Sequence, residues 1–393
     1  MQMKKYKLGE IAEINASSIK SSDKIDEILY LDTANITENR IDTLQRFGLK
    51  KAPSRAQRKV KDNTIIFSTV RPNQSHFGIM KNPASNLIVS SGFATLDIKK
   101  PDEFNADYLY YNLTQPFILN YLQTVAQNQV SSYPSINPSD LANLNLSFPP
   151  FPEQKKIASF LSTLDEKIAL NRRINAKLEQ MAKRLYDYWF VQFDFPNSDG
   201  KPYKSSGGKM VYNAELKREI PTGWEVKSFS DFFELGNGKD YRHLQSGKIP
   251  VYGSGGFMCG ITDFLFDGES VLFPRKGTLN NIMYKNEKFW TVDTMFYSKM
   301  KIQHSAIYVY YTAKKFDFSS LNTGTGVPSM TSVIIKGLSI IQPPQKIIDN
   351  FDCIVQSYYK KIHKNEQESA RLTALRDKLL PLLMNGQVEV KKE

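Results

Sequence analysis

The chain has 393 residues, which is enough for two or three domains that each bury a core. Hydrophobic residues make up 41% and aromatic residues 12%, so the composition is that of a folded protein and not of a disordered tail. The formal net charge of +12 favours a polyanionic partner such as nucleic acid. Two cysteines, no apolar leader and no run of 18 apolar residues argue against a secreted or membrane-spanning protein, and we expect a cytoplasmic one.

Residues 1–150 are expected to form a first globular domain. An amphipathic segment, YKLGEIAEI from Tyr6 to Ile14, opens it. Short β-branched and aromatic runs follow, such as NTIIFSTVRPNQSHFGIM and NLIVSSGFATLDI, and Gly, Pro and Asn punctuate them. This pattern predicts strands and turns with some helix.

The stretch SFPPF, from Ser147 to Phe151, closes this domain and raises the question of catalysis. Amino-methyltransferases place Asn, Asp or Ser directly before Pro-Pro, where its side chain accepts a hydrogen bond from the amino group of the base. Here Phe148 occupies that position, with Ser147 one residue too early. We therefore interpret the two prolines as a corner between the domain and a helix.

Residues 151–190 are expected to form a long helix. No Gly or Pro occurs from Glu153 to Phe190, and Pro152 sits where the first turn tolerates proline. Apolar residues recur at three-four spacing, which predicts one packed stripe: Ile157, Leu161, Leu164, Ile168, Ile174, Leu178, Met181 and Leu185. The aromatic segment YDYWF, Tyr186 to Phe190, either anchors a domain to this helix or binds a partner.

The remainder of the chain repeats this plan. A linker, 191–220, precedes a second domain, 221–342, whose opening VKSFSDFFEL echoes the first; a second helix, 343–386, and a tail, 387–393, follow. A shift of 194 residues aligns the copies without gaps. The identities are Pro134/Pro328, Ser135/Ser329, Leu144/Leu338, Pro149/Pro343, Pro150/Pro344, Lys167/Lys361, Ile168/Ile362, Asn171/Asn365, Ala176/Ala370, Leu178/Leu372 and Leu185/Leu379. The chain is a tandem duplication that keeps its frame, while the two domains share little between opening and corner.

The second helix carries a matching stripe: Phe351, Val355, Tyr358, Ile362, Leu372, Leu375 and Leu379. Pro381 and then Asn385-Gly386 are expected to stop it. Two helices with one stripe each most simply bury those stripes against each other, in either orientation. Asn171 and Asn365 interrupt the stripes at equivalent points, where they either fix the register or mark a gap in packing.

Motifs for catalysis or metal binding are missing from the sequence. No glycine-rich dinucleotide loop and no GxxxxGK[ST] stretch occurs, and the four histidines are scattered. No serine nucleophile elbow is present either. We therefore expect no catalytic residue, no metal site and no cofactor bound by this chain.

The order of these features resembles the specificity (S) subunit of type I restriction-modification enzymes. The phrases that carry the resemblance are EQKKIASFLSTLDEKI and YDYWF in the first helix, IIFSTVRP and VSSGF in the first domain, and IPVYGSGG, RKGT and LLPLLMNG in the second half. The resemblance covers essentially the whole chain. One departure is the opening of the first domain, which lacks the tryptophan that Trp224 supplies in the second; this leaves the exact start of that domain open.

The resemblance implies an α+β fold in which two globular α/β target recognition domains are separated by two long antiparallel coiled-coil helices, in a pseudo-twofold arrangement. Each domain would read half of a bipartite, asymmetric sequence in double-stranded DNA, and the helices would set the spacer. The implied partners are methyltransferase (M) subunits, two of them, and restriction (R) subunits. S-adenosylmethionine, ATP and Mg would then be bound by those partners, which would methylate adenine and cleave DNA.

The residues expected to contact DNA lie in basic and amide-rich segments. Arg pairs with guanine and Asn or Gln with adenine, while Lys and Arg neutralise phosphates. The first-domain candidates are Lys50, Lys51, Arg55, Arg58, Lys59, Arg71, Asn73, Gln74 and His76. The second-domain candidates are Lys239, Tyr241, Arg242, His243, Arg275, Lys276, Thr278 and Asn280.

Other functions remain open at this point. The chain could be the specificity chain of a related fused restriction system, which differs only in its partners. It could also be a self-sufficient methyltransferase or nuclease, against which the missing cofactor motifs argue. A coiled-coil adaptor that binds only protein is the third option, and DNA binding that ignores salt and the basic clusters would favour it.

Overall fold

The structure is a computed structural model, and it describes residues 2–20, 22–23, 25–128, 134–324 and 326–390. The chain divides into two compact units. The first unit is Met1–Asn171 with Gln367–Glu393, and the second is Arg172–Glu366. Within the described ranges, no helix is both long enough and apolar enough to cross a membrane.

The globular part of the first unit is built from small sheets and short helices. The strands form sheets in the order β1-β12, β6-β3-β10-β7, β2-β11-β8-β9 and β4-β5. Their bounds are β1 Lys4–Lys7, β2 Ala12–Ile14, β3 Glu27–Leu31, β4 Ile36–Thr37, β5 Arg40–Ile41, β6 Gln45–Gly48, β7 Ala56–Lys59, β8 Ile65–Ser68, β9 Phe77–Ile79, β10 Leu87–Ser90, β11 Phe93–Ile98 and β12 Asn145–Phe148. The helices are α1 Leu8–Ile11, α2 Ala106–Leu113, α3 Pro116–Gln127 and α4 Pro138–Ala142, with 3-10 turns η1 Thr33–Asn35, η2 Leu49–Lys51 and η3 Pro72–Gln74.

The globular part of the second unit is dominated by one six-stranded sheet, in the order β16-β21-β19-β20-β17-β18. Two strand pairs, β13-β14 and β15-β22, accompany it. The bounds are β13 Met210–Asn213, β14 Arg218–Pro221, β15 Glu225–Ser228, β16 Phe233–Asn237, β17 Ser246–Gly253, β18 Gly256–Ile261, β19 Phe266–Pro274, β20 Met283–Thr291, β21 Met295–Met300 and β22 Ser339–Gln342. The helices are α6 Phe229–Phe232, α7 Ala306–Ala313 and α8 Ser332–Gly337. Strands and helices thus alternate irregularly in both units, and the α+β class is confirmed.

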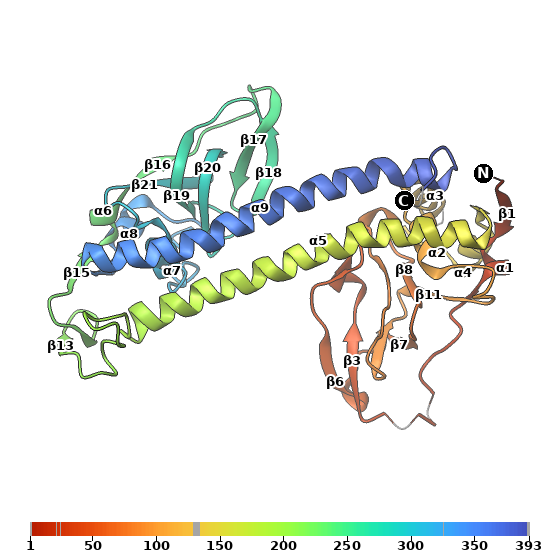
Figure 1. Ribbon diagram of the computed structural model, residues 1–393, viewed down its shortest axis with the longest axis horizontal. Helices are drawn as coiled ribbons and strands as arrows, with labels where there is room; N and C mark the ends of the chain where they lie inside the picture. The colour runs from red at the N-terminus through yellow and green to blue at the C-terminus, as the bar shows by residue number, and fades with distance from the viewer. Residues whose placement is uncertain (1, 21, 24, 129–133, 325, 391–393) are drawn as a thin grey trace. The chain divides into compact units, whose positions relative to one another are not determined.

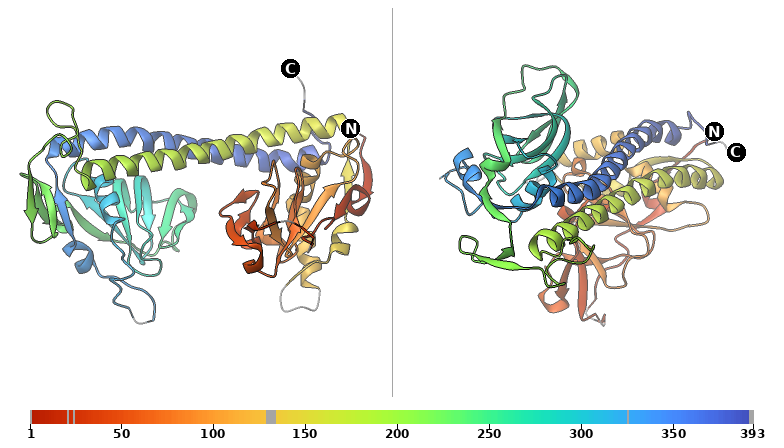
Figure 2. Two further views of the ribbon diagram at one scale, coloured as in Figure 1. Left: turned by 90° about the horizontal axis from the view of Figure 1, so that it is seen from below. Right: turned by 60° about the vertical axis from the view of Figure 1, so that its left-hand side comes forward.

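The two long helices are α5, Phe151–Tyr186, and α9, Gln345–Met384 (Figure 1). A π-helical turn, Asp187–Val191, continues α5. Within each unit the two helices run antiparallel, because contacting pairs have rising numbers on α5 and falling numbers on α9. The pairs are Asp165–Arg376 and Lys167–Glu368 in the first unit, and Asn175–Asn365 and Tyr186–Phe351 in the second. Figure 2 shows that the helix pair covers one side of the globular part in each unit.

Of the two stop signals predicted for the second helix, only Asn385-Gly386 ends it. Pro381 lies inside α9, which continues to Met384. Proline is tolerated there because it removes only one amide of the last turns, and its own carbonyl still accepts from the Asn385 amide at 3.0 Å. Gly386, with φ of +69°, provides the left-handed residue beyond the helix end. Pro381 is therefore not a stop signal, whereas Asn385-Gly386 is.

The apolar stripes pack against the globular parts as well as against each other, which corrects the simpler expectation. In the first unit Ile157 and Leu161 join Leu380 and Leu383 in the main core, and in the second unit Phe351 and Val355 join the main core there. Six of the predicted seam residues are buried: Ile157, Leu161, Ile168, Phe351, Val355 and Ile362. Six are half-buried: Leu164, Leu178, Leu185, Tyr358, Leu372 and Leu379. Met181 and Leu375 are exposed, so these two do not belong to the seam.

The two stripe asparagines do not mark a gap in packing. Asn171 is buried and donates to Glu368 Oε2 at 2.8 Å, across the helix pair. Asn365 is buried as well and donates to Asn175 Oδ1 at 2.8 Å. Both amides are hydrogen-bonded between helices, as a polar residue that fixes register requires; a role in register stays a hypothesis.

The aromatic segment that ends α5 is part of the second unit's core. Tyr186, Trp189 and Phe190 are all buried there. Phe190 lies 5.0 Å from Phe351 and 4.6 Å from Tyr308, between ring centroids. This segment therefore anchors the second globular part to the helix pair.

The globular parts repeat more than a comparison at constant offset reveals. Strand β1 pairs with β12 as β15 pairs with β22, so both openings lie against the strand before the proline corner. Helices α2 (ADYLYYNL) and α7 (AIYVYYTA) are 200 residues apart. The Tyr108 hydroxyl donates to the Ser147 carbonyl at 3.4 Å and the Tyr308 hydroxyl to the Ile341 carbonyl at 2.6 Å. Insertions and deletions change the offset from 194, which hid this match from the ungapped comparison.

Candidate nucleic-acid interface

In the first unit the candidate interface is built around the loop that follows β8, residues 69–76. Three backbone hydrogen bonds hold it. The Thr69 amide donates to the Gly92 carbonyl at 2.9 Å, the Arg71 amide to Pro134 at 3.0 Å, and the Ile136 amide to Thr69 at 2.8 Å. We call this segment the β8 loop.

In the second unit the loop that follows β19, residues 275–280, has the same three bonds. The Arg275 amide donates to the Thr294 carbonyl at 2.7 Å, the Gly277 amide to Pro328 at 2.9 Å, and the Met330 amide to Arg275 at 2.9 Å. This β19 loop is therefore equivalent to the β8 loop, with residue numbers 206 higher. Pro134 and Pro328 belong to the repeat found in the sequence, and the loops they hold were not found there.

One left-handed position is common to the two loops and carries different residues. Arg71 has φ of +48° and Gly277 has φ of +88°, so both adopt the left-handed backbone. Glycine does so freely, whereas a side chain there costs about 1 kcal/mol. Strained residues of this kind cluster at functional sites, where the side chain has a use that offsets its cost. Arg71 is exposed, so its guanidinium is presented at the surface of the loop.

The second unit brings its two predicted clusters together. The Lys239 amide donates to the Thr291 carbonyl at 2.8 Å, and the Arg275 amide donates to the carbonyl of Thr294, three residues further along the chain. Trp290 Nε1 further donates to the Lys239 carbonyl at 2.8 Å. Residues 239–243 and the β19 loop therefore flank the same turn between β20 and β21.

The first unit brings only part of its predicted set together. The Ser91 amide donates to the Arg55 carbonyl at 2.7 Å. The next residue is Gly92, whose carbonyl accepts from Thr69 in the β8 loop. Arg55 and the β8 loop are therefore neighbours. Lys51 lies in η2, where the Leu49 amide donates to the carbonyl of Asp26, directly before β3.

Most of the predicted contact residues are exposed, and a few are committed to the fold. Exposed are Lys50, Lys51, Arg55, Arg71, Asn73, Gln74, Lys239, Arg242, His243, Arg275, Lys276, Thr278 and Asn280. Arg58 is half-buried on β7 and donates to Ser18 Oγ at 3.1 Å. Lys59 pairs with Asp23 at 2.7 Å. The hydrogen bond from the Lys20 amide, followed by that from Lys59, lowers the pKa of Asp23. The structure thus gives Arg58 and Lys59 roles inside the domain.

Three further candidates are engaged with other parts of their own unit. His76 is half-buried, and its Nδ1 lies 2.6 Å from the Ile36 carbonyl, to which it donates. Tyr241 is half-buried beside the second unit's smaller core. Asn280, although exposed, donates to Asp317 Oδ1 at 2.9 Å and to Ser319 Oγ at 3.0 Å. The bonds of His76 and Asn280 hold the β8 and β19 loops to neighbouring segments.

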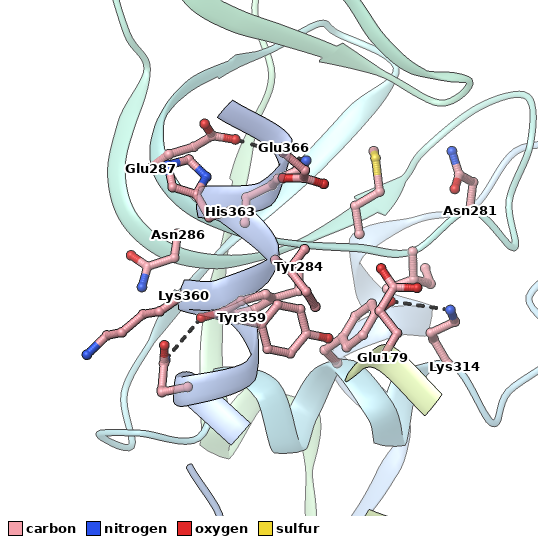
Figure 3. Close-up of a pocket in the computed structure, with 16 residues that line it drawn as sticks. Glu179, Asn281, Tyr284, Asn286, Glu287, Lys314, Tyr359, Lys360, His363 and Glu366 are labelled. Carbon is pink, nitrogen blue, oxygen red and sulfur yellow. Dashed lines mark hydrogen bonds and ion pairs between the residues drawn. The ribbon is translucent and has the colours of Figure 1, made fainter. Parts of the chain in front are cut away.

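A cleft lies behind the β19 loop, between β20, α7 and α9 (Figure 3). Its volume is about 400 Å³, and its walls combine polar side chains such as Glu179 and Asn286 with apolar ones such as Ile282 and Met283. Tyr284 and Tyr359 meet edge to face on its floor, 4.9 Å apart between ring centroids. Burial raises the pKa of both hydroxyls, so they stay neutral hydrogen-bonding groups.

The first unit has a cleft of about 290 Å³ at the equivalent place. Tyr110 and Thr114 line it where Tyr310 and Lys314 line the other. Sequence analysis missed both clefts, because their walls come from segments that are distant along the chain. Among the residues that the structure describes, no three His, Cys, Asp or Glu side chains lie close enough together to hold a metal ion.

Known proteins share both the sequence and the fold of this chain. A family model described as type I restriction modification DNA specificity domain matches residues 2–180 and 221–374. The type I restriction enzyme MjaIX specificity subunit of Methanocaldococcus jannaschii is 28% identical, over 99% of this chain and 94% of that one. The HindI specificity subunit of Haemophilus influenzae is 23% identical, over 98% and 99%. A crystal structure of the type I restriction-modification S subunit from M. genitalium has the same fold, with a TM-score of 0.62 at 16% identity, over 100% and 97% of the two chains.

The chain therefore belongs to the family of type I restriction-modification DNA specificity proteins. The resemblance stated from the sequence is confirmed, and the family's model matches once over each copy of the duplication.

Proposed function

We propose that this chain gives a type I restriction-modification complex its DNA sequence specificity, with each globular part reading one half of a bipartite, asymmetric site. The observation that carries the proposal is the duplicated loop. Two segments with the same backbone bonds, the β8 and β19 loops, carry different exposed side chains. A frame that is kept twice while its side chains differ suits the reading of two different half-sites.

The chemistry of the loops fits DNA. Arg71 and Arg275 can each form a bidentate hydrogen bond with the edge of a guanine, and Asn73 and Gln74 can do so with an adenine. Arg55, Lys239 and Lys276 flank them and would neutralise phosphates, which makes the affinity fall as salt rises. The net charge of +12 supports the same partner.

The helix pair is proposed to set the spacer and to dock two methyltransferase subunits. Each helix contributes to both units, since the division falls between Asn171 and Arg172 in α5 and between Glu366 and Gln367 in α9. The chain itself is proposed to be non-catalytic. Methyltransferase subunits would bind S-adenosylmethionine, and restriction subunits would supply ATP- and Mg-dependent cleavage.

The test is single-molecule methylome sequencing of cells that carry this gene, a neighbouring methyltransferase gene, or both. A bipartite adenine-methylated motif that needs both genes is the expected result, and it would give both half-sites. Methylation that appears without this chain, or with this chain alone, would show that reader and catalyst are not divided in this way.

A further inference from the structure

The hairpin β17–β18 at the edge of the second unit's sheet has an exposed apolar tip. Between Lys248 and Asp263 no side chain carries a charge, although charged residues make up 23% of the chain. Phe257 is 67% exposed and Met258 is 50% exposed. Two adjacent large apolar side chains at this exposure are informative, because most aromatic side chains in this unit are buried in its cores.

This tip belongs to the same surface as the β19 loop. Asn281 Nδ2 donates to the Ser254 carbonyl in the hairpin turn at 2.8 Å. A Cβ placed on Gly277 would come within 2.7 Å of Ser254 Oγ, so turn and loop are in close contact. On the other side, a Cβ on Gly253 would meet both Met258 Sδ, at 2.7 Å, and Val292 Cγ2, at 3.6 Å. Met258 therefore lies beside the 291–294 turn that holds Lys239 and Arg275.

The hairpin turn, residues 254–256, contains one glycine that neither its backbone conformation nor its packing requires. Gly256, with φ of +113°, needs glycine for its backbone. Gly255 does not, since its φ lies outside the left-handed range and a Cβ there would meet nothing within 4 Å. Internal packing thus gives no reason for glycine at position 255, whereas close approach to an external surface does.

We propose that the β17–β18 hairpin enters the major groove of the half-site read by the second domain, where Phe257 and Met258 contact the 5-methyl groups of thymines. The inference rests on the proposed function and extends it to an apolar part of the recognition code. The major groove admits a two-stranded β-ribbon, and apolar side chains distinguish thymine there by its methyl group. Lys239, Arg275 and Lys276 beside the tip favour a polyanion as its occupant over an apolar protein partner.

The experiment replaces thymine by uracil, which lacks only that methyl group, at each thymine of the methylated motif in turn. Binding of each duplex is measured with the full chain assembled with its methyltransferase partner. We expect about a fourfold loss of affinity at one or two positions, all within one half-site. With Phe257→Ala/Met258→Ala this loss disappears, because the methyl group has no partner left. With Tyr212→Ala, an equally exposed aromatic on the hairpin β13–β14, the loss persists.

A second variant tests the proposal independently, in case the double alanine variant does not fold. Gly255→Leu leaves the hairpin core untouched, and we expect it to weaken binding to the motif at least tenfold by filling the tip. The proposal is overturned if uracil is tolerated everywhere, if the loss persists in the double variant, or if Gly255→Leu binds normally. A rise in 2-aminopurine fluorescence that depends on Phe257 without any uracil effect would mean that the tip unstacks bases instead. Absence of any motif that depends on the chain would reject the proposed function, before this experiment begins.

Discussion

The two units join their globular parts to the helix pair at equivalent positions, but with different side chains. In the first unit the Tyr111 hydroxyl donates to Asp165 Oδ2 on α5 at 2.7 Å, and Arg376 from α9 binds the other oxygen of Asp165 at 2.8 Å. In the second unit the equivalent tyrosine, Tyr311, bonds to the hydroxyl of Tyr359 at 3.1 Å. Asp165 and Tyr359 occupy matching positions, 194 residues apart. One unit therefore joins its globular part to the helix pair with an ion pair, and the other with neutral hydroxyls.

The same division holds at the surface. The β8 and β19 loops share their backbone bonds, yet Arg71 stands where Gly277 stands. Topology fixes the backbone frame, because the strand pairing and the Pro-Ser segments recur in both units. The side chains on that frame are free to differ, as two different half-sites and two different junctions would require.

The largest expected effect concerns the charged junction. Burial alone would lower the pKa of Arg376, but the carboxylates of Asp165 and Asp377 outweigh it and raise that pKa. Asp165→Ala leaves the guanidinium largely buried without its main partner, so we expect the free energy of unfolding to fall by about 3 kcal/mol in urea titrations. Asp165→Ala/Arg376→Met should recover most of this loss. A double variant as unstable as the single one would show that the ion pair is not the cause.

The second prediction exchanges the strained residue for its counterpart. Arg71→Gly should leave the free energy of unfolding within about 1 kcal/mol of the wild type, because glycine tolerates the left-handed backbone. Affinity for the methylated motif should fall about tenfold, and the salt dependence should weaken by about one ion. Lys5→Ala, which removes the same charge from strand β1, is the control and should change affinity little. Equal losses of affinity in both variants would show that Arg71 contributes only its charge to DNA binding.

The third prediction concerns the neutral junction. Tyr359→Phe removes one hydroxyl from a buried pair and should lower the free energy of unfolding by about 1 kcal/mol. Burial raises the pKa of Tyr359 and Tyr311, so neither ionises and the loss should not vary between pH 6 and pH 9. Urea titrations at several pH values measure it. A loss as large as that of Asp165→Ala would remove the distinction between the two junctions.

The sequence predicts the frame of this protein well and its site only in part. The helices and the duplication follow from local periodicity and from an ungapped match, so they are readable residue by residue. The equivalence of the junction tyrosines and of the two loops cannot be read from the sequence in this way, because insertions change the offset between the copies. Bonds such as that from the Arg71 amide to the Pro134 carbonyl also join distant segments. Most of the charged candidates are exposed, as contact with DNA would require, while their role in binding stays a prediction. The bond from Arg58 to Ser18 could not be predicted from the sequence, because its partner lies 40 residues away.

An effect of similar size, but one that depends on pH, is expected for an acid at the junction of α9 with β19. Asp352 is buried beside Glu269, and burial, followed by the charge of Glu269, raises the pKa of Asp352 to about 6 from 3.8. A carboxyl with a raised pKa opposes folding once it ionises, so stability is lost as pH rises from about 4 through 6. His304, through its charge, and Gln356, through a hydrogen bond, oppose this shift, while the charge of Asp349 adds to it.

Asp352→Asn removes the ionisation and should raise the free energy of unfolding at pH 8 by about 1 kcal/mol, with the gain vanishing below pH 4. Asp349→Asn is the matched control on the same helix, since hydrogen bonds from Gln345 and His304 lower the pKa of Asp349. Its effect should have the opposite sign, with a loss at neutral pH that disappears in acid. Thermal unfolding from pH 4 to pH 8 separates the two. Parallel pH profiles for both variants would mean that neither carboxylate senses its own neighbours, and that this junction is as insensitive to pH as the tyrosine pair.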